Sequence, residues 1–221
     1  YTPWPARAQS LFEKIIHAYN EPHRKYHNNH HLVFVVDTIR TVGRYVDPLA
    51  VIPRQKVSEL DTALAVMAAF YHDVIYDMKP NAEQRSAEML SIDLTPTPIR
   101  LSHVQSMMRA VRATQGLGID SIAEPATKLL HDADVGILSA PAEFYERYRL
   151  NVWAEYGIMR VDEGSIACKT FLLGRKNFLM KACQDLAFSN LRPVNFTVEQ
   201  ARKNMNEEIR LIGKYLQGFR T

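Results

Sequence analysis

The chain has 221 residues, of which 47% are hydrophobic and 23% are charged, and its formal net charge is +3. This composition excludes a mainly disordered protein, because disorder needs low hydrophobicity and a high net charge. The small net charge disfavours a nucleic-acid-binding protein, and no apolar run approaches the roughly 18 residues that span a bilayer. Two cysteines suit a reducing compartment. We therefore expect a soluble cytoplasmic protein with a single domain over residues 1–221.

Apolar residues recur at helical spacing along most of the chain, which predicts an all-α fold. Strict alternation of apolar and polar residues, which would indicate strands, never persists. Prolines at positions 48, 53, 80, 98, 141 and 193 separate the apolar stripes, where a helix ends or begins. We predict a single-domain helical bundle of about eight to ten helices, with stripes over residues 32–46, 57–75, 99–111, 122–137, 144–152, 166–179 and 198–216.

The first group of candidate site residues stands at the start of the stripe over residues 32–46. His27 and His31 are four residues apart, so on a helix they share a face. His31 is also in line with Val35 and Ile39, which predicts that its side chain points inward. The alternative is that one or both are buried histidines with a backbone partner, which is the commoner case for an isolated pair of this spacing.

The second group is the pair His72-Asp73, near the end of the stripe over residues 57–75. Small residues such as Ala65 and Ala68 share the row of His72, which would let another helix approach closely. Adjacent residues on a helix are about 100° apart, so the two side chains can straddle one point. An imidazole and a carboxylate at one point suit a divalent cation. The alternative is a helix end capped by the pair.

The third group is His131-Asp132-Ala133-Asp134. Asp134 lies on an apolar row between Leu130 and Ile137, and a lone buried carboxylate must be paired, protonated or bound to metal. A salt bridge is the simplest alternative. Asp132 points the other way, so we expect it to be solvated or to stand behind the ligands.

The order of these groups along the chain resembles the metal site of the HD-domain phosphohydrolase superfamily. The chain is most similar to a group of predicted metal-dependent HD phosphohydrolases. The similarity covers about residues 12–213. It rests on the motifs Tyr26-His27-Asn28-Asn29-His30-His31-Leu32, Tyr71-His72-Asp73-Val74-Ile75-Tyr76, Arg85-Ser86-Ala87, Asp132-Ala133-Asp134-Val135, Tyr145 with Tyr148, Glu155-Tyr156, and Ala201 with Asn204 and Glu208-Ile209.

The resemblance implies a set of metal ligands and a reaction. The ligands would be His31, His72, Asp73 and Asp134, holding one divalent ion of Mn, Fe, Co, Ni, Zn or Mg. His27 would be a further ligand or a donor beside the metal. The reaction would be the hydrolysis of a small phosphoester, a nucleotide by preference, by metal-activated water. The candidate proton acceptors are Asp73, His27 and Glu83.

Several side chains near the motifs are candidates for substrate binding. Cations would neutralise the phosphate, and aromatic rings would stack on a base or sugar. For each cation the alternative is a solvated surface charge, and for each ring it is the edge of the core. The candidates are Arg24, Lys25, Lys79, Arg85, Arg112, Tyr26 and Tyr76.

The chain departs from the related sequences at two places. Related sequences tend to carry one or two histidines directly after a threonine, but the stretch Ala113-Thr114-Gln115-Gly116-Leu117 has none, which favours one metal ion unless His103 supplies a ligand. Trp153 stands where an arginine often precedes Glu-Tyr, so a phosphate contact is expected to be missing. Two alternatives therefore stay open: an inactive module that binds a nucleotide or a partner, and a di-iron oxygenase. As partners we expect a small phosphorylated substrate but no membrane or nucleic acid; the sequence leaves a homo-oligomer open.

Overall fold

The computed structural model describes residues 4–44, 57–120, 122–158 and 166–218. Within these ranges the chain forms only helices, which confirms the predicted all-α fold. Residues 45 and 46 of the first stripe and the prolines at 48 and 53 lie outside the described residues. The helices are α1 (Trp4–Tyr19), α2 (Asn29–Arg44), α3 (Glu59–Tyr71), α4 (Ala82–Leu94), α5 (Leu101–Ala113), α6 (Pro125–Val135), a short 3₁₀ helix η1 (Gly136–Ser139), α7 (Ala142–Glu155), α8 (Ile166–Asp185) and α9 (Val198–Gly218).

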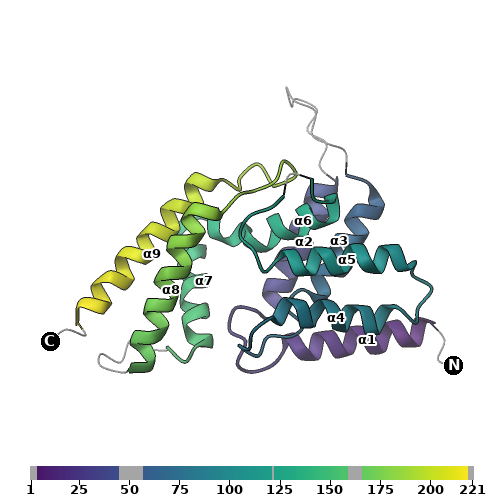
Figure 1. Cartoon of the computed structure of the whole chain (residues 1–221), viewed down its shortest axis with the longest axis horizontal. Coiled ribbons are helices and arrows are strands. Elements are labelled where there is room, and N and C mark those ends of the chain that lie inside the picture. Colours follow the sequence, from purple (N-terminus) through teal and green to yellow (C-terminus); the bar gives the residue numbers. More distant parts are fainter. Residues whose placement is uncertain (1–3, 45–56, 121, 159–165, 219–221) are drawn as a thin grey trace.

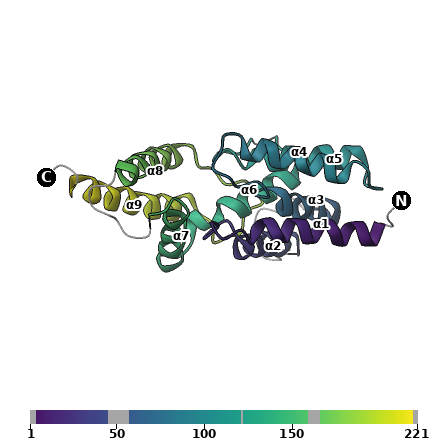
Figure 2. The same cartoon turned by 90° about the horizontal axis from the view of Figure 1, so that it is seen from below.

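The helices pack around two clusters of buried apolar side chains. The first cluster draws on α1 to α6, and the second draws on α7 to α9 together with the end of α6 and η1. Figures 1 and 2 show α7, α8 and α9 at one end of the molecule and α1 to α5 at the other, with α6 between them. Among the described helices, none combines the length and the apolar character needed to cross a bilayer.

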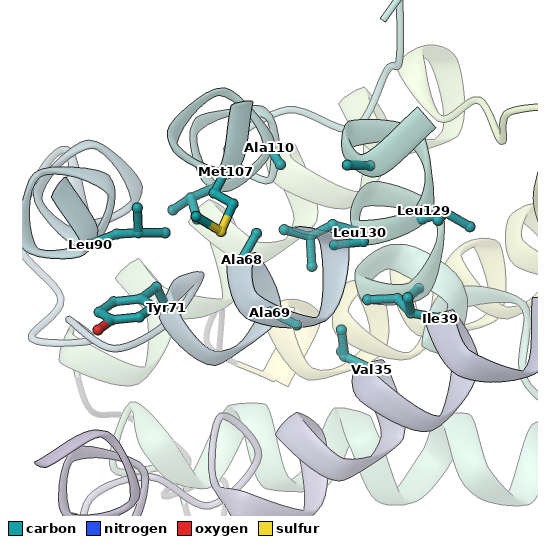
Figure 3. Packing of buried hydrophobic residues seen from close by; sticks show 14 of the residues in the cluster. Val35, Ile39, Ala68, Ala69, Tyr71, Leu90, Met107, Ala110, Leu129 and Leu130 are labelled. Carbon is teal, nitrogen blue, oxygen red and sulfur yellow. The ribbon is translucent and has the colours of Figure 1, made fainter. Parts of the chain in front are cut away.

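Helix α3 is the central helix of the first cluster, and its buried face is made of small side chains. Ala65, Ala68 and Ala69 are fully buried, and Figure 3 shows Ala68 and Ala69 among side chains from α2, α5 and α6. Small residues let neighbouring helices approach closely. The helix begins at the cap Ser58, whose hydroxyl accepts a hydrogen bond from the backbone N–H of Asp61. At its other end, Tyr71 and the following His72 are buried.

The second cluster contains a buried ion pair that joins its three helices. The guanidinium of Arg175 on α8 donates to the carboxylate of Glu208 on α9 over 2.9 and 3.2 Å. From α7, Tyr145 and Trp153 donate to the same carboxylate over 2.6 and 3.0 Å. Burial by itself raises the pKa of Glu208, but the Arg175 charge and these donors outweigh burial and lower the pKa below its ordinary value. Glu208 therefore has a structural role in the second cluster. The same network holds the Trp153 side chain in this cluster.

Glu208→Gln is expected to destabilise the fold by about 3 kcal/mol, because it leaves the Arg175 charge buried without a counter-charge. Denaturant unfolding at pH 7 measures the effect. Because the pKa of Glu208 is lowered in the folded state, its charge stabilises the fold above the ordinary glutamate value of about 4.3. That contribution is lost as the pH falls through the folded-state pKa. The difference in the free energy of unfolding between variant and parent should therefore shrink at low pH.

The matched control is Glu207→Gln, one residue earlier on α9. The Glu207 side chain is 63% exposed and pairs with Arg210 at the surface, so its loss should change the free energy of unfolding by less than about 1 kcal/mol. Equal destabilisation by the two variants would contradict the role assigned to the buried pair.

Candidate metal centre

Four side chains that can bind metal converge at the inner end of α3. One ligand atom from each of His31, His72, Asp73 and Asp134 lies within 4.8 Å of the other three. His31 is on the first turns of α2, His72 and Asp73 follow the last residue of α3, and Asp134 is near the end of α6. Both histidines are buried, and both aspartates are partly buried. The structure therefore brings together the four residues that the resemblance gives as ligands.

The spacing of these atoms fits a single metal ion. Nε2 of His31 lies 3.0 Å from Nε2 of His72, and it lies 3.2 Å from Oδ1 of Asp134 and 3.4 Å from Oδ2 of Asp73. Ligand atoms about 2.1 Å from an ion and roughly 90–110° apart are about 3.0–3.4 Å from one another. Oδ2 of Asp73 is buried and forms no hydrogen bond, although Nε2 of His72 is 3.2 Å away. This cluster can hold a metal ion.

The tautomer of His72 also suits metal binding. Its Nδ1 lies 2.7 Å from the carbonyl oxygen of Ala69. A carbonyl oxygen only accepts, so Nδ1 carries the proton and the neutral ring presents the lone pair of Nε2 to the cluster. The hydroxyl of Tyr19 accepts from the backbone N–H of Asp73 over 3.2 Å, which fixes the turn that carries the next ligand.

The charges of the four side chains balance a divalent cation, because two neutral imidazoles and two carboxylates sum to −2. Burial alone lowers the pKa of His72, but Asp73, Tyr19 and Asp134 together outweigh burial and raise that pKa well above its ordinary value. Burial likewise raises the pKa of Asp73, but His72 outweighs it and holds the carboxyl well below its ordinary range. A proton and a cation therefore compete for Nε2 of His72.

His27 lies beside the cluster and not on the helix that carries His31. The prediction that the two histidines share a helix face is wrong, because Asn28 caps α2: its side chain accepts from the backbone N–H of His30 over 2.9 Å. His27 belongs to the turn before the helix. Its ring stacks on Tyr76 with centroids 4.2 Å apart, and it stands outside the four-residue group.

Glu155, at the end of α7, fixes the turn that carries His27. Its carboxylate accepts from the backbone N–H groups of Tyr26 and His27, each over 2.8 Å. It also lies 2.8 Å from Nδ1 of His27 and accepts from the hydroxyl of Tyr76 over 2.9 Å. Burial raises the pKa of Glu155, but its hydrogen bonds from His27 outweigh burial and lower it. Glu155 has no predicted role of its own, although the Glu155-Tyr156 motif is a signal that could have pointed to one.

A cavity of about 300 Å³, here called the metal cavity, opens beside the cluster. Asp73 and Asp134 line it, and so do the candidate catalytic residues His27 and Glu83. Of the side chains predicted to bind substrate, Lys79 and Tyr76 line the cavity. The position after which related sequences carry a histidine, Thr114, lines it too. His103, the alternative source of a ligand, is not in the cluster.

Arg24 has a different role from the predicted one. Its guanidinium is buried and donates to the backbone carbonyl oxygens of Asp73 over 2.6 Å and Val74 over 3.0 Å. It also donates to Glu21 over 2.9 Å. These bonds direct its charge at the turn after α3, and Arg24 is not among the described residues that line the metal cavity. Arg24 therefore positions Asp73, and the prediction of a phosphate contact is not supported.

Four other predicted substrate residues also have partners within the protein. Arg85 donates to both carboxylate oxygens of Asp77, over 2.9 and 2.6 Å. Arg112 donates to Gln84 over 2.6 Å, and Lys25 donates to the carbonyl oxygen of Pro22 over 2.7 Å. The ring of Tyr26 packs against His31 with centroids 4.8 Å apart. Among the residues that line the metal cavity, none of the four is found.

The expectation that Asp132 is solvated is wrong. It is 1% exposed, so it is not solvated. Its carboxylate accepts from the backbone N–H and the hydroxyl of Ser189 over 2.9 and 2.5 Å. Asp132 therefore attaches α6 to the connection between α8 and α9, while Asp134 faces the cluster.

Comparison with protein-family models finds no matching family, and comparison with curated proteins finds no similar one. The resemblance to HD phosphohydrolases therefore stays a prediction based on the motifs. The convergence of the four side chains is a separate observation, and it holds whichever family the chain belongs to.

Asp73→Ala is expected to abolish metal binding, because it removes a carboxylate and half of the charge that balances the cation. Elemental analysis of the purified parent, after soaking in Mn, Fe, Co, Ni, Zn or Mg salts, should find about one equivalent of a divalent metal. The control is Asp37→Ala, which removes an exposed carboxylate from α2. Equal metal content in the two variants, or none in a folded parent, would contradict a metal site here.

Proposed function

We propose that the chain is a metal-dependent hydrolase of the HD type that cleaves a small phosphoester, with a nucleotide as the preferred substrate class. The observation that carries the proposal is the cluster of His31, His72, Asp73 and Asp134 at the wall of a cavity that a small phosphate can enter. The order of these residues along the chain supports the assignment to HD phosphohydrolases.

The four residues of the cluster would hold the metal ion. When bound there, a divalent cation lowers the pKa of a coordinated water and polarises a phosphoryl oxygen. Lys79 lines the metal cavity, so we expect it to bind a phosphate oxygen. Its weak pairing with Asp77, over 3.6 Å at the surface, leaves it free to turn.

His27 is the best candidate for proton transfer. Because Nδ1 faces the Glu155 carboxylate at 2.8 Å, that nitrogen carries the proton, and Nε2 is left to accept or donate at the cavity. The pair formed by His27 and Glu155 thus has the arrangement of a histidine base held by a buried carboxylate. Glu83 lines the same cavity and is the second candidate. Asp73 is the third, because it also lines this cavity.

His27→Gln is expected to lower kcat by about 10²–10⁴-fold, the usual contribution of a general acid or base, without loss of metal. A panel of phosphoesters, assayed with the metal that the parent retains, measures the effect. The matched control is His23→Gln: His23 stacks on Tyr76 with parallel rings but does not line the metal cavity. Its kcat should stay within a few-fold of the parent.

Two other outcomes separate the alternatives. A metal-loaded parent that binds nucleotides but cleaves no phosphoester would replace the hydrolase with a binding module. An unchanged kcat in His27→Gln would remove His27 from the reaction and leave Glu83 and Asp73 as the bases to test.

A further inference from the structure

A second and larger cavity adjoins the metal cavity. Its volume is about 840 Å³, which lies in the range of sites for whole small molecules. His27, Tyr76, Glu83 and Tyr156 line both cavities, so the two spaces meet at these four side chains. We call the larger space the aromatic cavity.

The walls of the aromatic cavity are apolar and aromatic. Tyr148 and Val152 on α7 line one side, and Phe171 and Phe178 on α8 line the other. Phe178 is 42% exposed. Rings on two sides of a space suit a flat apolar group, which gains dispersion and ring-stacking contacts with them.

Among the described residues that line this wall, Arg175 is the arginine, and it does not make the wall a phosphate site. Arg175 lines the cavity, but Nε and Nη2 are engaged by Glu208 and by the hydroxyl of Tyr148. The carboxylate of Glu208 neutralises its charge within the wall. Lys79, in contrast, lines the metal cavity and is exposed. The two cavities therefore differ in chemistry, with charge on the metal side and aromatic surface on the other.

We propose that the aromatic cavity binds a planar aromatic group of the substrate, of the size of a nucleoside, while the phosphate of the same molecule lies in the metal cavity. The proposal rests on the proposed function for the bond that is cut, but the binding of the planar group can be measured without any reaction. Phe171 and Phe178 would be the residues that determine specificity.

Gly174 offers a way to fill the aromatic cavity without disturbing the fold. It lies on α8 and lines the cavity, and a Cβ built on it meets no atom within 4 Å. Gly174→Leu should therefore project a side chain into the open space and also favour the helix. Gly213→Leu is the matched control, since a Cβ there also meets nothing within 4 Å and Gly213 on α9 does not line the cavity.

The test uses adenosine 5′-monophosphate and glycerol phosphate as probes, with binding measured by calorimetry in the full chain. We expect Gly174→Leu to weaken binding of the adenosine compound by about tenfold or more, to leave binding of glycerol phosphate unchanged, and to retain bound metal. Gly213→Leu should bind both probes as the parent does. If Gly174→Leu binds the adenosine compound as tightly as the parent, or if the parent binds it no better than glycerol phosphate, the proposal is overturned.

Turnover of the same probes separates this proposal from the proposed function. If Gly174→Leu loses binding of the adenosine compound and the parent hydrolyses neither probe, the aromatic site is retained and the hydrolase is rejected. Hydrolysis of both probes at the same kcat/KM, unchanged in Gly174→Leu, would retain the hydrolase and reject the aromatic site.

Discussion

The buried guanidinium of Arg24 fixes the turn after α3, and the arrangement of the four candidate ligands depends on that turn. Helix α3 ends at Tyr71, and the chain must turn there to present His72 and Asp73 side by side. Backbone carbonyl groups in such a turn have no partners within the helix, and burying them unpaired is costly. Arg24 donates hydrogen bonds to two of these carbonyl groups, and the hydroxyl of Tyr19 accepts one from the backbone N–H of Asp73. A residue that never touches the cavity thereby fixes the geometry of two ligand candidates.

The two halves of the molecule meet through a second buried charge. Glu155, from α7, accepts hydrogen bonds from the turn before α2 and from Tyr76 after α3. Three segments far apart in the sequence are thus joined at one carboxylate, and they enclose the place where the metal cavity and the aromatic cavity meet. The lowered pKa of Glu155 follows from these contacts, since each donor favours its charged form.

The sequence predicts the parts of this site that depend on local pattern. Apolar rows place His31 and Asp134 on the inward faces of helices, and the structure confirms both positions. The sequence does not predict contacts that only the tertiary fold creates. Asp132 bonds to Ser189, 57 positions away, and Arg24 bonds to carbonyl groups about 50 positions away. The position of His27 depends on a helix start that Asn28 sets locally, and the periodic pattern cannot place that start to within two residues.

The division of the core into two clusters separates the candidate metal ligands from most of the aromatic wall. The four ligand candidates lie on α2, directly after α3 and on α6, whereas most of the aromatic cavity comes from α7 and α8. Exposed wall positions such as Phe178 can change without altering the packing around α3. Substitutions in one half of the molecule can therefore reshape the aromatic cavity while the other half keeps the four candidate ligands in place.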